Sequence, residues 1–160
     1  MIPTSAARVA SLPRVRILGL DLGARRIGLA ISDEEGRIAF PAGHLDRVGP
    51  KKDLAALETL IAERGVARAV VGLPLHMDGR AGPEAEAARA FATSLAARTS
   101  IPVDLLDERW TTVAAERSLR GSRAGARRRG KGVVDAVAAT LLLSTYLERL
   151  RNPLERGTGR

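Results

Sequence analysis

The 160-residue chain has no cysteine, few aromatic residues and no long hydrophobic run, and each of these absences excludes a class of protein. Without cysteine there is no disulfide and no thiolate chemistry, so a metal site would need oxygen or nitrogen ligands. Aromatic residues make up only 2% of the chain, so Val, Leu, Ile and Ala must build the core. The longest apolar stretch, 133–147, contains Asp135 and is too short and too polar to span a bilayer. Residues 1–14 lack the apolar segment of a signal peptide, and we therefore expect a cytoplasmic protein.

Positive charge is what the chain has in excess. The formal net charge is +8, and 23 of the 26 basic residues are arginine, which suits bidentate contacts with phosphate better than lysine does. Codon bias in a GC-rich genome is the alternative explanation, because it raises Arg and Ala together. The charge favours a nucleic acid as partner over a membrane surface.

The order of apolar segments predicts one α/β domain over residues 15–150, with flexible tails at 1–14 and 151–160. Short buried runs predict strands and 3.6-residue periodicity predicts helices. The predicted strands are 15–20, 27–31, 37–45, 67–73 and 101–107, and the predicted helices are 50–63, 83–98, 111–119 and 133–150. Three strands followed by alternating helices and strands indicate a five-stranded mixed sheet, antiparallel at first and parallel afterwards.

Acidic residues stand where this topology could bring them together. Asp21 closes the first strand, which holds no Lys or Arg from Ile17 onward to compensate a buried carboxylate. Asp107 and Glu108 close the fifth strand, and Asp135 lies in an apolar part of the last helix. The pattern alone does not choose between Asp107 and Glu108. Grouped carboxylates that stay ionised favour a divalent cation, and oxygen ligands in a basic protein suit Mg²⁺ or Mn²⁺ for phosphodiester hydrolysis.

Each acid also has a simpler interpretation. Asp21 could be a turn residue bonded to the backbone of Gly23 or Ala24. Asp135 could be a first-turn acid favoured by the helix dipole. The three acidic positions together are more persuasive than any one of them.

Candidate substrate-binding residues surround these acids. Arg26 and Arg109 could face a phosphate or pair with a nearby acid, and Thr111 could cap a helix or offer amides to a phosphate. The segment 120–131 is basic and glycine-rich and contains no acid, which fits a clamp on a nucleic-acid backbone or a solvated linker. Its candidate contacts are Arg123, Arg127, Arg128, Arg129 and Lys131.

Four motifs in order resemble the YqgF family, also called RuvX, the Holliday junction resolvases with an RNase H-like fold. The motifs lie at 21–28 (DLGARRIG), 71–79 (VGLPLHMDG), 107–112 (DERWTT) and 131–139 (KGVVDAVAA). The resemblance implies a nuclease whose catalytic and metal-binding acids are Asp21, Glu108 and Asp135, and it leaves Asp107 as a supporting residue. Two departures stand out: His76 occupies a position that is more often Asn, and the final helix offers one acid where RuvC resolvases present two.

The resemblance also implies a role. The family is associated with processing the 5′ end of pre-16S ribosomal RNA, so the expected partner is pre-rRNA or another structured RNA, with branched DNA as the alternative substrate. We expect a monomer or a weak homodimer. The competing function is a non-catalytic nucleic-acid-binding module of the same fold, acting in ribosome maturation, transcription or recombination. A sugar-kinase-like phosphate loop is rejected, because 160 residues supply only one of the two domains that such proteins close around ATP.

Overall fold

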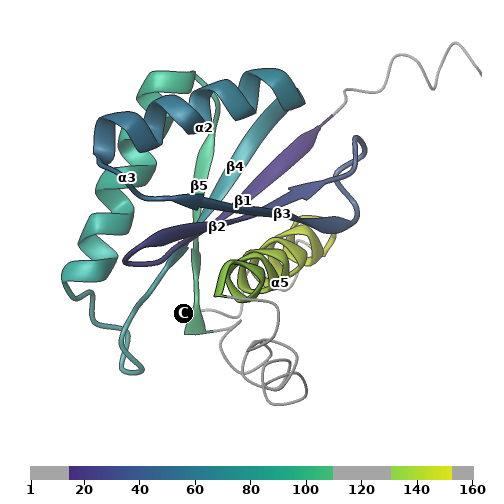
Figure 1. Cartoon of the computed structure of the whole chain (residues 1–160). Coiled ribbons are helices and arrows are strands. Elements are labelled where there is room, and N and C mark those ends of the chain that lie inside the picture. The colour runs from purple at the N-terminus through teal and green to yellow at the C-terminus, as the bar shows by residue number, and fades with distance from the viewer. Residues whose placement is uncertain (1–14, 110–130, 153–160) are drawn as a thin grey trace, which may run out of the picture.

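A single mixed sheet of five strands forms the centre of the computed structural model, which describes residues 15–109 and 131–152 (Figure 1). The strand order is β3-β2-β1-β4-β5. The strands are β1 (Arg16–Leu22), β2 (Arg26–Ser32), β3 (Ala39–Asp46), β4 (Val66–Leu73) and β5 (Val103–Asp107). The predicted fold class, an α/β protein with a five-stranded mixed sheet, is confirmed.

Strand pairing brings the ends of three strands to one edge. β1 pairs antiparallel with β2 and parallel with β4, which in turn pairs parallel with β5. In this register Asp21 lies opposite Gly28, and Asp107 lies opposite Leu73. Because the carboxyl ends of parallel strands meet at the same edge, the residues that follow β1, β4 and β5 can share one site.

Helices cover both faces of the sheet (Figure 1). One face carries α2 (Pro50–Arg64) and α3 (Pro83–Thr99), whose buried residues include Leu57, Ile61 and Leu95. The other face carries α5 (Lys131–Arg151), which buries Leu143 and Leu147 against the sheet. Proline starts both α2 and α3, where its missing N–H costs nothing, and Gly65 ends α2 in the left-handed conformation. None of the described helices is both long and apolar enough to cross a membrane.

Two predicted strands begin too early. The predicted third strand starts at 37, but the amides of Arg37 and Ile38 donate to the side chain of Asp33 and close a turn instead. The predicted fifth strand starts at 101, but Pro102 has no N–H to donate and β5 begins at Val103. The predicted helix at 111–119 lies outside the described residues. The predicted tails and domain limits remain predictions.

Candidate active site

Asp21 lies near the end of β1, the central strand. Its neighbour Leu20 is fully buried, while Asp21 itself is partly buried. Gly23 makes the sharp turn that follows, and its amide donates to the carbonyl of Arg26 at 2.8 Å. The sequence therefore places a carboxylate just before a tight hairpin, in a position where water is partly excluded.

Glu108 reaches this acid from the end of β5. Its amide donates to the carbonyl of Leu73 at 3.0 Å, which continues the pairing of β5 with β4 for one residue. Its side chain then lies directly over Gly72: a Cβ placed on Gly72 would be 2.3 Å from Oε1 of Glu108. Glycine at position 72 is therefore what leaves room for the Glu108 carboxyl group.

The side chains of Asp21 and Glu108 are hydrogen-bonded to each other. Burial, followed by the negative charge of Asp21, raises the pKa of Glu108 to about 7. Burial also raises the pKa of Asp21; the hydrogen bond from Glu108 opposes that shift and the charge of Asp135 adds to it. Below this raised pKa, Glu108 carries a proton and donates it to the Asp21 carboxylate, so the pair then has one negative charge instead of two.

Asp135 approaches from the opposite face on α5. A Cβ on Gly28 would lie 2.1 Å from the carbonyl oxygen of Asp135, so only glycine lets α5 pack this closely on β2. Nη1 of Arg26 lies 3.9 Å from Oδ2 of Asp135, and Nε of Arg26 lies 3.5 Å from Oδ1 of Asp46. Arg26 is thus inside the acidic site, where it balances part of the negative charge.

Arg109 is engaged within the protein. Its guanidinium binds the carboxylate of Asp107 at 2.6 Å and donates to the carbonyl of Met77 at 3.2 Å. Burial alone would raise the pKa of Asp107, but the hydrogen bonds from Arg109 outweigh it and lower that pKa. Of the two sequence alternatives for Arg109, pairing with an acid is what the structure shows, and a contact with phosphate remains a prediction. Asp107 and Glu108 thus have separate partners, and Glu108 is the one that contacts Asp21.

The remaining predicted contacts are not described by the structure. Thr111, Arg123, Arg127, Arg128 and Arg129 lie outside the described residues. Lys131 is the first residue of α5, but its side chain is also outside them. Their predicted roles stay predictions.

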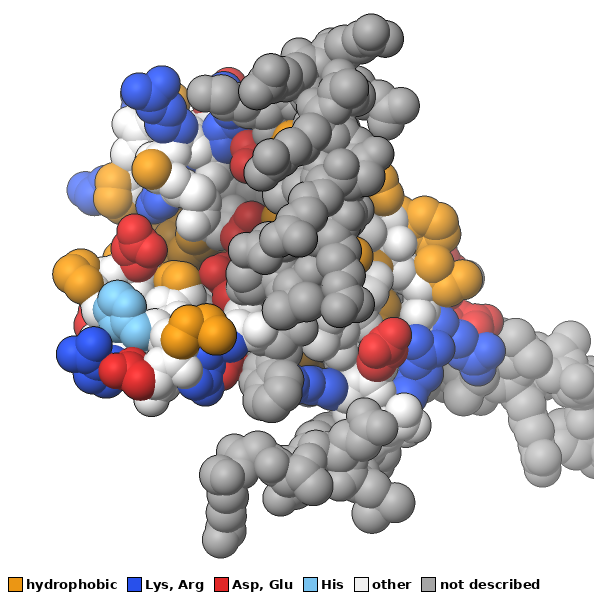
Figure 2. All heavy atoms as spheres, turned by 90° about the horizontal axis from the view of Figure 1, so that it is seen from below, with side chains coloured by type: hydrophobic (Ala, Val, Ile, Leu, Met, Phe, Trp, Pro, Cys, Tyr) orange, Lys and Arg blue, Asp and Glu red, His pale blue; other side chains and the backbone are white. Residues whose placement is uncertain are grey.

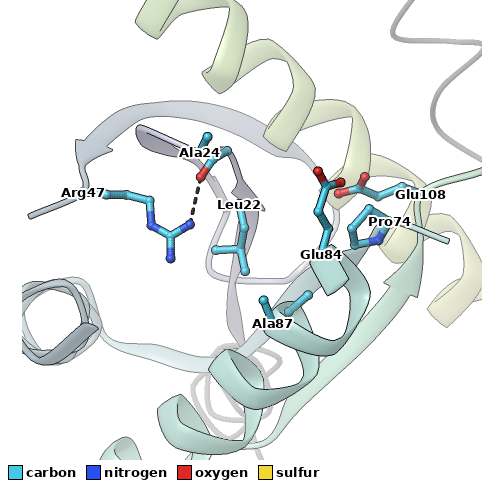
Figure 3. A pocket seen from close by; sticks show the side chains of 9 residues that line it. Leu22, Ala24, Arg47, Pro74, Glu84, Ala87 and Glu108 are labelled. Carbon is cyan, nitrogen blue, oxygen red and sulfur yellow. Dashed lines mark hydrogen bonds between the residues drawn. The ribbon is translucent and has the colours of Figure 1, made fainter. Parts of the chain in front are cut away.

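Sequence reasoning missed a pocket next to Glu108. It has a volume of about 340 Å³, and Glu84 from the first turn of α3 and Arg47 from the end of β3 lie on opposite sides of it (Figure 3). Gly82 and Pro83 marked the helix start and could have located Glu84 in that turn. Nothing in the sequence showed that this turn would face Glu108.

Figure 2 shows the molecule from below, with acidic side chains beside the grey atoms near the centre and both acidic and basic side chains toward the edges. Solved structures share the arrangement of the sheet and helices. The chain is similar to the RuvC of T. thermophilus in complex with a Holliday junction substrate, with a TM-score of 0.54 and 13% identity over 86% of this chain and 97% of that one. It is also similar to the Holliday junction resolvase of fowlpox virus, with a TM-score of 0.52 and 12% identity over 85% of this chain and 99% of that one. The fold is therefore the RNase H-like fold of these resolvases.

Sequence comparison narrows this class to one family. Residues 15–149 match the family model described as RuvX, Holliday junction resolvase. A protein of Chloroflexus aggregans with the name "Putative pre-16S rRNA nuclease" is 49% identical, over 86% of this chain and 96% of that protein. A protein of Moorella thermoacetica with the same name is 48% identical, over 85% and 96%. The chain belongs to the RuvX family, and it is a nuclease, a hydrolase that acts on ester bonds.

Proposed function

We propose that this nuclease cleaves the precursor of 16S ribosomal RNA near its 5′ end, using Asp21, Glu108 and Asp135 as its catalytic acids. The observation that carries the proposal is the direct contact between Asp21 and Glu108, with the charge of Asp135 close enough to raise the pKa of Asp21. Three carboxyl groups from β1, β5 and α5 therefore converge at one edge of a strongly basic protein. The names of the relatives support rRNA as substrate.

The chemistry of the donor set fits a divalent cation. All three side chains offer hard oxygen ligands, and the proton held between Asp21 and Glu108 is one that a cation would displace. Among residues 15–109 and 131–152, no three acidic or histidine side chains are arranged as a metal-binding cluster. Bound there, Mg²⁺ or Mn²⁺ would supply the Lewis-acid chemistry of phosphodiester hydrolysis.

The protein's own groups have distinct tasks in this proposal. Asp21 and Glu108 together give up the shared proton and become the paired negative charge of the site. Asp135 adds a third carboxylate from the far face of the sheet. Arg26 lies between Asp135 and Asp46 and limits the repulsion among these acids, and it is the described cation best placed to meet a phosphate at the site.

The first test compares cleavage of two substrates, a pre-16S rRNA leader and a four-way DNA junction, by wild type and Asp21→Asn with Mg²⁺ or Mn²⁺. We expect metal-dependent cutting of the RNA that Asp21→Asn abolishes, with the variant still folded by circular dichroism. Equal binding by both proteins, with no cutting by either, would overturn the proposal and leave a nucleic-acid-binding module. Cutting of the junction alone would overturn the assignment of substrate.

A further inference from the structure

The pocket beside Glu108 is polar at its two ends and apolar between them. Its anionic end holds Glu84 and Glu108, and Arg47 lies at the other end (Figure 3). Leu22, Pro74, Ala87 and Ala88 supply apolar surface, and Leu22 lies between Arg47 and Glu84 (Figure 3). A hollow of about 340 Å³ is large enough for a nucleoside but not for stacked base pairs.

Beyond Arg47 the surface is basic. We call Arg25, Arg47, Lys51 and Lys52 the basic rim. Two hydrogen bonds hold its two segments together: the amide of Arg47 donates to the carbonyl of Arg25, and Nη1 of Arg47 donates to the carbonyl of Gly23, each at 2.9 Å. Arg47 therefore joins the hairpin that follows Asp21 to the pocket, and its ion pair with Asp53 joins it to the first turn of α2.

Three of the four cations of the rim have no side-chain partner among the described residues. Arg25, Lys51 and Lys52 are exposed, and their side chains make no hydrogen bond or ion pair with any residue in 15–109 or 131–152. Arg47 lies 3.7 Å from the buried Asp53, but its guanidinium has five N–H donors and keeps some for a ligand.

Several exposed arginines elsewhere are paired, whereas Arg64 and Arg151, at the ends of α2 and α5, have no side-chain partner among the described residues. Arg80 binds Asp78 at 2.5 Å, Arg89 binds Glu86 at 3.1 Å, and Arg98 binds Glu58 at 2.8 Å. The basic rim therefore gathers three cations without a partner among the described residues, and its Arg47 lines the same pocket as the proposed catalytic Glu108.

We propose that the pocket and the basic rim bind the single-stranded RNA that continues from the scissile phosphate. One unstacked nucleotide would occupy the pocket, with its phosphate toward Arg47 and its sugar and base over the apolar floor. Glu84 at the opposite end repels phosphate and so favours this direction. The inference rests on the proposed function, and it adds that the substrate must be unpaired at this position, since a base inside a helix could not enter the pocket.

Binding is measured with Asp21→Asn protein, which keeps the RNA intact, by fluorescence anisotropy of a labelled leader RNA at several salt concentrations. The test variant adds Arg25→Ala, Lys51→Ala and Lys52→Ala. The matched control adds Arg64→Ala, Arg98→Ala and Arg151→Ala, three exposed cations at the far ends of α2, α3 and α5. Both variants lose three positive charges, so overall charge is the same and only the position differs. Thermal melting confirms that both are folded.

We expect the test variant to lower the slope of log K against log salt by about 2, at roughly 0.7 per phosphate contact, and to weaken binding tenfold or more. The control should keep the wild-type slope. Removing the unpaired nucleotides on one side of the cleavage position should weaken RNA binding by the Asp21→Asn parent protein. The same truncation should lower the affinity of the test variant only a little further. Equal salt slopes for the test and control variants would overturn the inference. An equal loss of affinity on truncating the RNA, in the parent protein and in the test variant, would also overturn it. A failed cleavage assay would overturn the proposed function alone, because this test does not depend on cutting.

Discussion

Gly72→Ala should separate the geometry of the active site from the stability of the fold. The new Cβ would lie 2.3 Å from Oε1 of Glu108 and 3.0 Å from its Cγ and Cδ. The carboxyl group must then move by about 1 Å to reach an ordinary contact distance. A displacement of that size in a catalytic group costs about 100-fold in rate. The atoms in the way are the far end of a flexible side chain, so the free energy of unfolding should change by only about 1 kcal/mol.

The assay is single-turnover cleavage of the leader RNA at saturating Mg²⁺, together with thermal melting. A double-mutant cycle supplies the control, because Glu108→Asp shortens the side chain by one methylene and withdraws it from the new Cβ. We expect Gly72→Ala to cost much less in the Glu108→Asp background than in wild type. A wild-type rate for Gly72→Ala would refute the argument, and so would equal losses in both backgrounds.

Three further predictions concern the same acids. Glu108→Gln should abolish cleavage without unfolding the protein, whereas Asp107→Asn should be milder; equal losses in a cleavage assay would contradict the separate partners of the two acids. In EDTA, the stability of the protein to urea should fall as the pH rises from about 5 to 8. The reason is that the pKa of Glu108 in the folded state, about 7, lies above its value in the unfolded state, so the folded state binds more protons in that range. Glu108→Gln should flatten this pH dependence. Gly28→Ala should cost both activity and about 1–3 kcal/mol of stability in a urea titration, because its Cβ would meet the backbone oxygen of Asp135, which cannot turn away as a side chain can.

The sequence predicted the fold well because its strands are short, apolar and clearly bounded. The hairpin that carries Asp21 and the parallel strands that end at Leu73 and Asp107 all came from local patterns. The two errors with a clear physical cause fell at strand starts, where the competing interactions are specific. The side chain of Asp33 holds the turn before β3, and Pro102 delays β5. Hydrophobic patterning contains neither of these effects.

The candidate site was predictable only in part. Pattern reasoning placed Asp21 at a strand end but left Asp107 and Glu108 as equals, because adjacent residues on a strand point to opposite faces and the sequence does not say which face meets β1. The structure separates them through two contacts, Asp107 with Arg109 and Glu108 with Asp21. The pocket lined by Glu84 depends on how α3 packs beside the first hairpin, which no local signal records.

Two glycines explain why these acids meet at all. Gly28 lets α5 approach β2 and so brings Asp135 to the sheet, while Gly72 leaves the space that Glu108 occupies. Neither needs glycine for its backbone conformation, since neither has a positive φ. In each case a side chain would fill space that a proposed catalytic acid or its helix now takes. The acids supply the proposed chemistry, but the absence of two side chains from neighbouring strands determines where that chemistry can take place.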